Sequence, residues 1–378
     1  MLCSLDEICL VPGRTSKVSS RSECEIYKSD KLPLYVAPMA SLIDAKNIDD
    51  FETCGFNTIL PRTLDLELRM EMLSQGYTVA FGLKEAEHIF NRLGVLKVNN
   101  QLNYKPHICI DQANGHMDDL LNLCRRFKEL LGRHGVWIMT GNIANPGTYY
   151  EYAKVGIDAV RIGIGTGSAC TTSIQTGIHY PMGSLIVNCC HAKFEVEEQI
   201  NIDYGDSYKP WAVADSLNDM NSDISEYKSV PKIIADGGFK TIDQIIKALA
   251  LGADYVMLGE IIAQSKEACG ETKWTLLDGV HCDARLYYGM STVKAQEDIN
   301  NTSSIQNDIK HSEGICKWVP VKYSINDWKE SFEHGLKSAM SYTGASNLDE
   351  FISHVQWNTM SPSTIFEYKQ NKKVYTWD

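Results

Sequence analysis

The sequence contains no long apolar run and no excess of positive charge. In its 378 residues no hydrophobic stretch is long enough to span a bilayer, and Asp6 and Glu7 interrupt the segment where the core of a signal peptide would lie. The formal net charge is -12, which argues against nucleic acid or an anionic membrane as the main partner. We therefore expect a cytoplasmic protein that binds neither a membrane nor a nucleic-acid polymer.

The sequence also contains no Cys-x-x-C pair and no Cys/His cluster with the spacing of zinc ligands, although it has 12 cysteines. This pattern argues against a disulfide framework or a structural metal. Cysteine in a large core usually acts as a small buried hydrophobic residue, and most of these should be free thiols. Only Cys170 has a local context that indicates chemistry.

Short apolar runs alternate with helical patterns, which is typical of a parallel sheet in an α/β fold. The predicted strands are Leu34–Pro38, Asn57–Leu60, Thr78–Gly82, His107–Ile110, Val136–Met139, Ala159–Gly163, Lys232–Ala235 and Tyr255–Leu258. The predicted helices between them are Asn47–Thr53, Leu66–Ser74, Lys84–Leu96, Met117–Leu131, Gly147–Val155 and Thr241–Leu251. Eight strands with this period predict a (β/α)₈ TIM barrel, as one catalytic domain over residues 1–378.

Two segments interrupt the alternation, and both follow late strands. Residues 189–230 form an insertion after the sixth strand, in which Phe194–Ile202 alternates like a hairpin strand and Ala212–Tyr227 resembles a delayed barrel helix. Residues 268–319 follow the eighth strand and are polar around Gln296–Asp308, which predicts a mobile flap over the active site. A C-terminal helix over Asp327–Tyr342 and a surface tail from Ser361 complete residues 327–378.

One segment combines several features of a catalytic loop. Arg161–Pro181 reads RIGIGTGSACTTSIQTGIHYP and begins inside a predicted strand. Closely spaced glycines allow backbone amides to hold a phosphate and backbone carbonyls to coordinate a cation. A thiolate at Cys170 would be a nucleophile for an electrophilic purine carbon, and Thr172 lies within reach to move a proton. The glycines alone also occur in ordinary βα loops.

The longer string resembles a known family. Gly163–Thr172 is similar to the catalytic-loop signature shared by the IMP dehydrogenase/GMP reductase family, and TGIHYP at Thr176–Pro181 resembles the continuation found in its GMP reductase branch. Further similar motifs follow in family order: DEICLVP at 6–12, SRSEC at 20–24, VAPM at 36–39, DQANG at 111–115, TGNI at 140–143, ADGG at 235–238, VMLG at 256–259, YGMS at 288–291, SEG at 312–314 and SYTGA at 341–345. Together they cover most of the chain.

The resemblance implies a covalent mechanism. Cys170 would attack C2 of a purine nucleotide, while hydride passes between that carbon and a nicotinamide. In a GMP reductase, ammonia leaves and NADPH reduces the adduct to IMP. Thr172 and Glu313 match the pair that moves protons as the amine departs. Without the family context, Glu313 would be read as a solvated carboxylate of the flap.

The resemblance also implies the ligand sites. The nucleotide would contact Ser168, Asp236, Gly237, Gly238, Gly259, Gly289, Met290, Ser291, Asn142 and Met39. Ser168, Gly238 and Gly259 match a phosphate site in which backbone amides do most of the binding. Asp236 matches the residue that binds the ribose hydroxyls, Met290 and Ser291 match positions that contact the base, and Asn142 and Met39 would line the pocket floor. NADPH would contact Ser20, Arg21, Arg62, Asp111, Gln112, Ala113, Ile164, Gly165, Ser338 and Ser341. Ser338 and Ser341 would come from a neighbouring subunit, which implies a homotetramer. A K⁺ ion would be bound by the backbone carbonyls of Gly165, Gly167 and Cys170.

Several residues depart from the family pattern. Gly259-Glu260 replaces a Gly-Gly pair and puts a carboxylate beside the expected phosphate, so that either Glu260 points away or the ligand differs. Arg62 replaces a usual Lys, and Thr166 replaces a usual Pro. These changes and the insertion are compatible with a deoxy or otherwise modified guanine nucleotide as substrate.

Two alternatives remain at this stage. An IMP dehydrogenase would oxidise IMP with NAD, but its catalytic Arg-Tyr dipeptide is missing between Met290 and Glu313. A purine-nucleotide-binding barrel without catalytic activity would suit Glu260 and the insertion, but it has no use for a nucleophile and a proton relay. NADPH consumption with GMP, against NADH formation with IMP, distinguishes the two enzymes.

Overall fold

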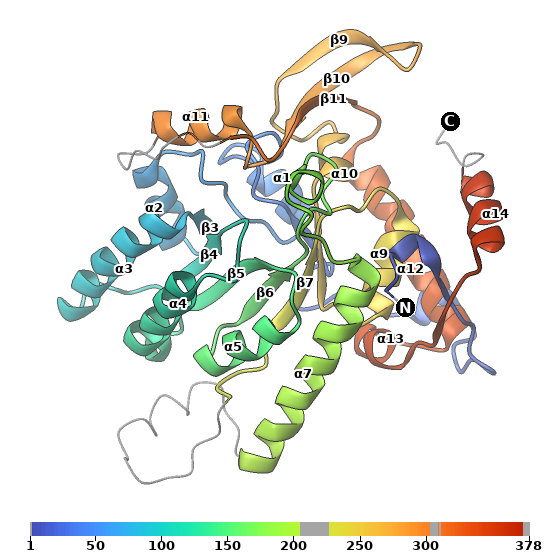
Figure 1. Ribbon diagram of the computed structural model, residues 1–378, viewed down its shortest axis with the longest axis horizontal. Coiled ribbons are helices and arrows are strands. Elements are labelled where there is room, and N and C mark those ends of the chain that lie inside the picture. Colours follow the sequence, from blue (N-terminus) through green and yellow to red (C-terminus); the bar gives the residue numbers. More distant parts are fainter. Residues whose placement is uncertain (1, 205–226, 303–308, 310, 373–378) are drawn as a thin grey trace.

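The computed structural model describes residues 2–204, 227–302, 309 and 311–372 of the chain. Seven parallel strands form one curved sheet in the order β2-β8-β7-β6-β5-β4-β3, with helices packed around the outside (Figure 1). The strands are β2 (Leu34–Val36), β3 (Thr78–Phe81), β4 (His107–Asp111), β5 (Trp137–Ile143), β6 (Ala159–Ile162), β7 (Lys232–Asp236) and β8 (Tyr255–Leu258). The fold is therefore the expected α/β barrel of the TIM type.

The predicted second strand, Asn57–Leu60, is reduced to two single bridges. Asn57 pairs with Tyr35 of β2, and Leu60 pairs with Val79 of β3. The carboxamide of Asn57 also donates to the carbonyls of Leu32 and Leu34, so its side chain takes over contacts at the start of β2. The two bridges occupy the eighth position of the ring, between β2 and β3.

The predicted outer helices form within a few residues of their expected bounds, as α1 (Ile48–Thr53), α2 (Leu66–Ser74), α3 (Leu83–Val98), α4 (Asp118–Leu131), α5 (Gly147–Val155) and α9 (Ile242–Ala250). Helices of the barrel that were not predicted are α7 (Met182–Tyr204) and the short α6 (Thr172–Thr176) and α10 (Glu260–Ala263) at the rim. In α4 the buried side chains recur every three or four residues, and Asp65 caps α2 by accepting from the amides of Glu67 and Leu68.

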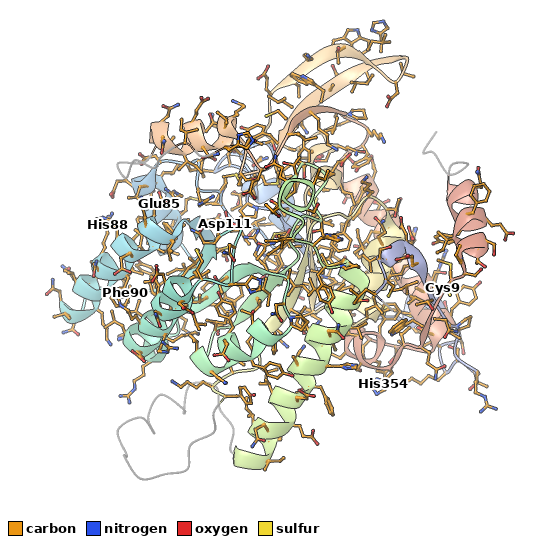
Figure 2. The ribbon with its side chains drawn as sticks, in the orientation of Figure 1. Cys9, Glu85, His88, Phe90, Asp111 and His354 are labelled. Atoms are coloured by element: carbon orange, nitrogen blue, oxygen red, sulfur yellow. The ribbon has the colours of Figure 1, made fainter. Side chains whose placement is uncertain are left out.

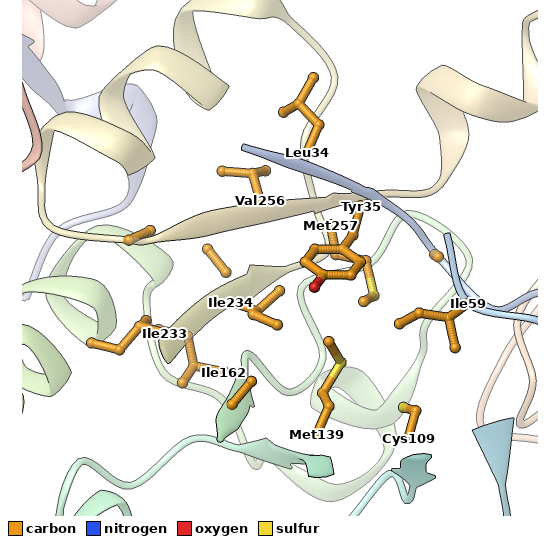
Figure 3. Close-up of a cluster of buried hydrophobic side chains, with 14 of the residues drawn as sticks. Leu34, Tyr35, Ile59, Cys109, Met139, Ile162, Ile233, Ile234, Val256 and Met257 are labelled. Carbon is orange, nitrogen blue, oxygen red and sulfur yellow. The ribbon is translucent and has the colours of Figure 1, made fainter. Parts of the chain in front are cut away.

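The interior of the barrel is filled by apolar side chains from several strands (Figure 3). Tyr35 and Met257 are direct neighbours in the register of β2 and β8, and Cys109 and Met139 are direct neighbours in β4 and β5. All four are buried. The barrel centre is thus a packed core, and the chemistry has to lie at one end.

The expected hairpin strand at Phe194–Ile202 is wrong, because these residues continue the long helix α7. Along this helix Leu185, Cys189, Ala192, Val196 and Ile200 form one buried stripe at helical spacing, whereas Phe194 and Ile202 are exposed. The apolar residues that alternate in this segment therefore include residues of the buried helix face together with the exposed Phe194 and Ile202. Because α7 packs on α5 and β7, it is the barrel helix after β6, and that helix is not delayed. The predicted helix Ala212–Tyr227 lies, except for Tyr227, outside the described residues.

The segment 268–319 is largely regular structure where a polar loop was expected. It contains β9 (Thr272–Leu277), β10 (Val280–Tyr288), α11 (Val293–Thr302) and β11 (Cys316–Pro320), and the strands form an antiparallel sheet that projects beyond the barrel (Figure 1). We call residues 268–319 the flap. At its base the buried Arg285 donates to the carbonyls of Gly270, Ala263, Ser265 and Lys266, which anchors β10 to the end of α10.

The C-terminal region is helical, with α12 (Ile325–Thr343), α13 (Leu348–His354) and α14 (Pro362–Lys372). The expected surface tail is therefore a helix, and its Tyr368 hydroxyl donates to Asp243 of α9. Strand β12 (Trp357–Thr359) pairs with β1 (Ile8–Leu10) near the other end of the chain. Among the described residues, no helix is both long and apolar enough to cross a membrane.

A buried ion pair joins α2 to the start of α3. Arg69 is fully buried and makes a two-pronged contact with Glu85, with nitrogen–oxygen distances of 2.7 and 3.2 Å. Glu85 lies among the helices outside the sheet (Figure 2). Burial alone raises the pKa of Glu85, but Arg69 outweighs burial and holds that pKa below its usual range.

We predict that Arg69→Met destabilises the chain by about 3–5 kcal/mol, because the Glu85 carboxylate loses its guanidinium partner while staying buried. Urea denaturation measures the change. The control is Arg92→Met, which breaks the more exposed contact of Arg92 with Glu67 and should cost less than about 1 kcal/mol. Equal losses in the two variants would contradict the assignment of a buried stabilising pair.

Candidate active site

A chain of three side chains links the loop after β6 to the flap. The Cys170 thiol lies 3.3 Å from the Thr172 hydroxyl, which donates to Glu313 Oε2 at 2.7 Å. Cys170 and Thr172 are close in sequence, but Glu313 lies 141 positions after Thr172. The structure therefore brings together the three residues that sequence reasoning assigned to catalysis, in the order nucleophile, hydroxyl, carboxylate.

Main-chain contacts hold the same two segments together. Cys170 and Gly314 form an antiparallel bridge, the Thr171 amide donates to the Glu313 carbonyl at 2.8 Å, and the Ile315 amide donates to the Ala169 carbonyl at 2.9 Å. A Cβ atom at Gly314 would lie 2.9 Å from the Ala169 carbonyl oxygen, so glycine allows this close approach. The flap is docked on the Cys170 loop in this structure.

A network of ionic groups lies at the carboxyl ends of β4, β6 and β7. Arg161 contacts Asp111 at 2.5 Å and Asp236 at 2.7 Å, and all three side chains are at least 88% buried. Asn142 donates to Asp236 at 2.8 Å, and Arg62 Nε lies 3.1 Å from Asp111 without a well-aligned hydrogen bond. Burial raises the pKa of Asp111, but Arg161 and Arg62 outweigh burial and hold that pKa below its usual range.

The residues expected to hold a phosphate surround the loop before Cys170. Gly237 and Gly238 have φ of +93° and +85°, and a Cβ atom at Gly238 would lie 2.7 Å from the Thr166 carbonyl. A Cβ atom at Gly259 would lie 2.5 Å from the Tyr287 hydroxyl. The Ser168 hydroxyl is buried beside them and makes no well-formed hydrogen bond with the described residues. A buried donor without a partner suits a pocket that receives a ligand oxygen.

The residues expected around the base lie beside the same loop. Gly289 faces Ala169, where a Cβ atom would have 3.7 Å to the carbonyl oxygen, and Ser291 accepts from the Glu313 amide at 3.4 Å. Met290 lies between them, immediately after β10. Met39, after β2, places its sulfur within 3.8 Å of the Cβ position at Gly259. These residues thus come from two separate parts of the chain, the segment after β10 and the segment after β2.

The expected cofactor residues fall into two groups. Arg62, Asp111, Gln112, Ala113, Ile164 and Gly165 lie at the barrel end near Arg161. Figure 2 marks Asp111 at that end. Ser338 and Ser341 lie on α12, which packs against α9 and the 3₁₀ turn Arg21–Glu23 that follows Ser20. Asp111 ends β4, whereas α9 follows β7, and strands β5 and β6 lie between β4 and β7 in the sheet.

The carbonyls expected to bind K⁺ provide neutral oxygen donors, which suit that cation. In the present loop conformation the Gly165 carbonyl accepts from the Ser173 hydroxyl at 3.2 Å, and the Gly167 carbonyl accepts from the Cys170 amide at 2.9 Å. Each carbonyl oxygen keeps a second lone pair, so the donor chemistry fits K⁺. No cluster of three or more His, Cys, Asp or Glu side chains with metal-binding geometry occurs in the described part of the chain.

Sequence reasoning missed three residues of the site. Arg161 stands inside the motif that was singled out, and a charged residue in an apolar strand is itself a signal of a buried partner. Tyr287 directly precedes the motif YGMS, and its hydroxyl lies near Ser168, Glu260 and Cys170, which are among the groups that perturb its pKa. The residues around Lys317 of β11 do not indicate a role in the site, because its partner Glu260 is remote in sequence.

The carboxylate that departs from the family pattern has a partner in the structure. Glu260 Oε2 lies 2.9 Å from Lys317 Nζ of the flap. Burial raises the pKa of Glu260, but the adjacent Ser168 and Lys317 side chains and the charge of Lys240 lower it below its usual range.

A parallel α/β barrel with a cysteine loop at its carboxyl end, covered by a flap that carries a carboxylate, has the arrangement of barrel enzymes, whose active sites lie at that end. The family model "IMP dehydrogenase / GMP reductase domain" matches residues 77–215 and 212–370, and the chain belongs to this family.

Relatives within the family include both enzymes. GMP reductase of Staphylococcus carnosus is 28% identical over 358 residues, which cover 91% of this chain and 92% of the relative. GMP reductase of Caenorhabditis elegans is 26% identical over 297 residues, 75% of this chain and 71% of the relative. IMP dehydrogenase of Chlorobaculum parvum is 32% identical over 257 residues, 66% of this chain and 44% of the relative. The similarity to the first of these extends over nearly the full length of both chains.

We predict that Gly238→Ala costs more stability than Gly279→Ala. Both glycines have positive φ, +85° and +83°, so both variants carry a backbone penalty of about 1–2 kcal/mol. Only Gly238 adds a clash with Thr166, whereas a Cβ atom at Gly279 meets nothing within 4 Å. Urea denaturation gives both losses, and the rate of Cys170 alkylation by iodoacetamide should change only in Gly238→Ala. Similar behaviour of the two variants would refute the tight packing of Gly238 on the loop.

Proposed function

We propose that this chain catalyses the NADPH-dependent reductive deamination of GMP, or of a closely related guanine nucleotide, to the corresponding hypoxanthine nucleotide. The overall reaction is GMP + NADPH + 2 H⁺ → IMP + NH₄⁺ + NADP⁺. The observation that carries the proposal is the contact chain from the Cys170 thiol through Thr172 to Glu313. GMP reductase of Staphylococcus carnosus matches nearly the full chain length, which supports this direction of the reaction.

In the first half of the reaction, the Cys170 sulfur adds to C2 of the guanine ring as a thiolate. The C2–N bond then breaks, and the departing amine needs a proton because an unprotonated amide ion is too poor a leaving group. Thr172 lies between the sulfur and Glu313, so its hydroxyl can pass a proton from the carboxyl group to the amine while Glu313 replaces it. Ammonia leaves, and the purine stays attached to Cys170 through its C2–S bond.

In the second half, the residues around Asp111 would hold NADPH, which would supply a hydride equivalent to C2. Breaking the C2–S bond would return its electron pair to the Cys170 sulfur, and the hypoxanthine nucleotide would leave. Asp236 is positioned to accept a hydrogen bond from a ribose hydroxyl, because Arg161 and Asn142 occupy its Oδ2. Asp111, held by Arg161 and Arg62, is the residue we assign to the side of the pocket that holds the nicotinamide.

The same proposal includes a K⁺ ion, a cytoplasmic location and a homotetramer. The carbonyls of Gly165, Gly167 and Cys170 are the K⁺ donors. The tetramer is supported by the separate places of the two groups in the fold: Asp111 ends β4, whereas Ser338 and Ser341 lie on α12, which packs on α9 after β7. A cofactor long enough to reach from Asp111 beyond its own barrel would meet these residues in a neighbouring copy.

The direct test is a spectrophotometric assay of NADPH oxidation with a panel of guanine mononucleotides, with and without K⁺, coupled to detection of ammonia. We expect oxidation of NADPH with release of one ammonia per NADPH consumed, and faster turnover with K⁺. NADH formation from IMP, with no NADPH oxidation in any arm, would instead assign the chain as an IMP dehydrogenase.

We predict that Cys170→Ser lowers kcat by more than about a thousandfold, because the hydroxyl is a far weaker nucleophile than a thiolate at neutral pH. The matched control is Cys316→Ser, since Cys316 is exposed on the flap and lies outside the contact chain. Unchanged turnover in Cys170→Ser would rule out the covalent mechanism.

We predict that Glu313→Gln and Thr172→Val each lower the rate of ammonia release by about 100-fold or more, because both interrupt proton delivery. Hydride transfer from IMP to NADP⁺ in the reverse half-reaction involves no amine and should remain near the wild-type rate. Single-turnover measurements of the two half-reactions separate these effects. Equal loss of both half-reactions would mean that the residues act on the fold or on Cys170 itself.

A further inference from the structure

Glu260 and Lys317 form an ion pair at the end of the site where the resemblance implies a phosphate held mostly by backbone amides. Glu260 Oε2 lies 2.9 Å from Lys317 Nζ, and the side chains are 18% and 29% exposed. Glu260 follows β8 directly, whereas Lys317 belongs to β11 of the flap. The pair therefore connects the barrel rim to the flap across the expected phosphate position.

Two hydroxyl groups complete the cluster. Tyr287 is the direct cross-strand neighbour of Lys317, and its hydroxyl points to Gly259. The Ser168 hydroxyl is fully covered and lacks a well-formed partner among the described residues. An unpartnered buried hydroxyl beside two charged groups indicates a place that a ligand oxygen fills.

The charges of this cluster are defined at neutral pH. Burial raises the pKa of Glu260, but the adjacent Ser168 hydroxyl, the hydrogen bond and charge of Lys317 and the charge of Lys240 outweigh burial and lower that pKa below its usual range. Glu260 is therefore ionised. In the contact that the structure shows, one carboxylate faces one ammonium group, so an arriving anion would compete with Glu260 for Lys317.

We propose that the Glu260–Lys317 pair sets the affinity of this pocket for the 5′-phosphate of its nucleotide: Lys317 binds the phosphate from the flap, and Glu260 opposes it by like charge. This inference rests on the proposed function. It explains how a carboxylate is tolerated beside a phosphate, since Lys317 can be shared between two anions. It also makes Lys317 a specificity-determining residue that favours a nucleotide over the free nucleoside.

The position of Lys317 in the chain adds a consequence for the reaction. Lys317 lies four residues after Glu313, on the same flap segment that bridges to Cys170. A phosphate bound by Lys317 would hold this segment against the barrel, with Glu313 beside Thr172. One segment would then contact both the phosphate end and the reacting end of the substrate.

The test is equilibrium binding by isothermal titration calorimetry with the full chain and no nicotinamide, using GMP, guanosine and inorganic phosphate as ligands. The variants are Lys317→Met, Glu260→Gln and the double variant. Lys273→Met is the matched control, because it removes the same charge from an exposed position of the same flap sheet. Thermal unfolding of each variant checks that the fold is kept.

We expect opposite signs for the two single variants. Lys317→Met should weaken GMP binding about tenfold or more, and Glu260→Gln should tighten it about threefold or more, because one removes an attraction and the other a repulsion. Guanosine, which has no phosphate, should bind all variants alike, and Lys273→Met should match the wild type. The salt dependence of GMP binding should become shallower in Lys317→Met.

Weaker GMP binding in both single variants, or the same change for guanosine as for GMP, would overturn the inference and make the pair a structural contact. Failure of the proposed function has a different signature. A wild-type chain that binds inorganic phosphate with the expected opposite responses, but neither GMP nor guanosine, would retain the role of the pair and refute a guanine substrate.

Discussion

The arrangement of the site depends on one buried cation. Arg161 lies at the end of β6 and contacts the carboxylates that end β4 and β7. Two carboxylates buried this deeply would each be costly without a partner, and one guanidinium satisfies both with directed hydrogen bonds. The side chain of Asn142 and the orientation of Asp236 follow from this contact, because Asp236 Oδ2 receives both Arg161 and Asn142. Arg161 thus contacts both Asp236, which we assign to the nucleotide, and Asp111, which we assign to the cofactor.

Much of the fold could be predicted because parallel strands are buried on both faces and appear as short apolar runs. The ends of these strands meet at one rim, so motifs far apart in sequence, such as those at Asp111 and Asp236, converge without any further assumption. The prediction failed at Phe194–Ile202, where alternation on one long helix imitates a strand. The prediction of a full strand at Asn57–Leu60 was also too long. This segment forms only two single bridges, and the Asn57 side chain donates to two main-chain carbonyls near β2.

The side-chain partners in the site could not be predicted in the same way. The contact of Lys317 with Glu260 depends on the register of β11 on β10 and on how the flap docks, and neither is encoded locally. The role of Arg161 was accessible in principle, because an arginine in a buried strand requires counter-charges, but the sequence does not say which carboxylates supply them. Glu313 was found only through its resemblance to a known motif.

The main-chain bridge between Cys170 and Gly314 joins the loop of the proposed nucleophile to the flap segment that carries Glu313, the proposed proton donor. If the flap lifts, the hydrogen bonds of Thr171 and Ile315 are lost together with the position of Glu313, and the thiol remains without the carboxyl group that would let an amine depart. In the proposed mechanism, an adduct formed in that open state would revert to its starting materials. The proposed reaction would therefore go forward only while the flap is docked on the Cys170 loop.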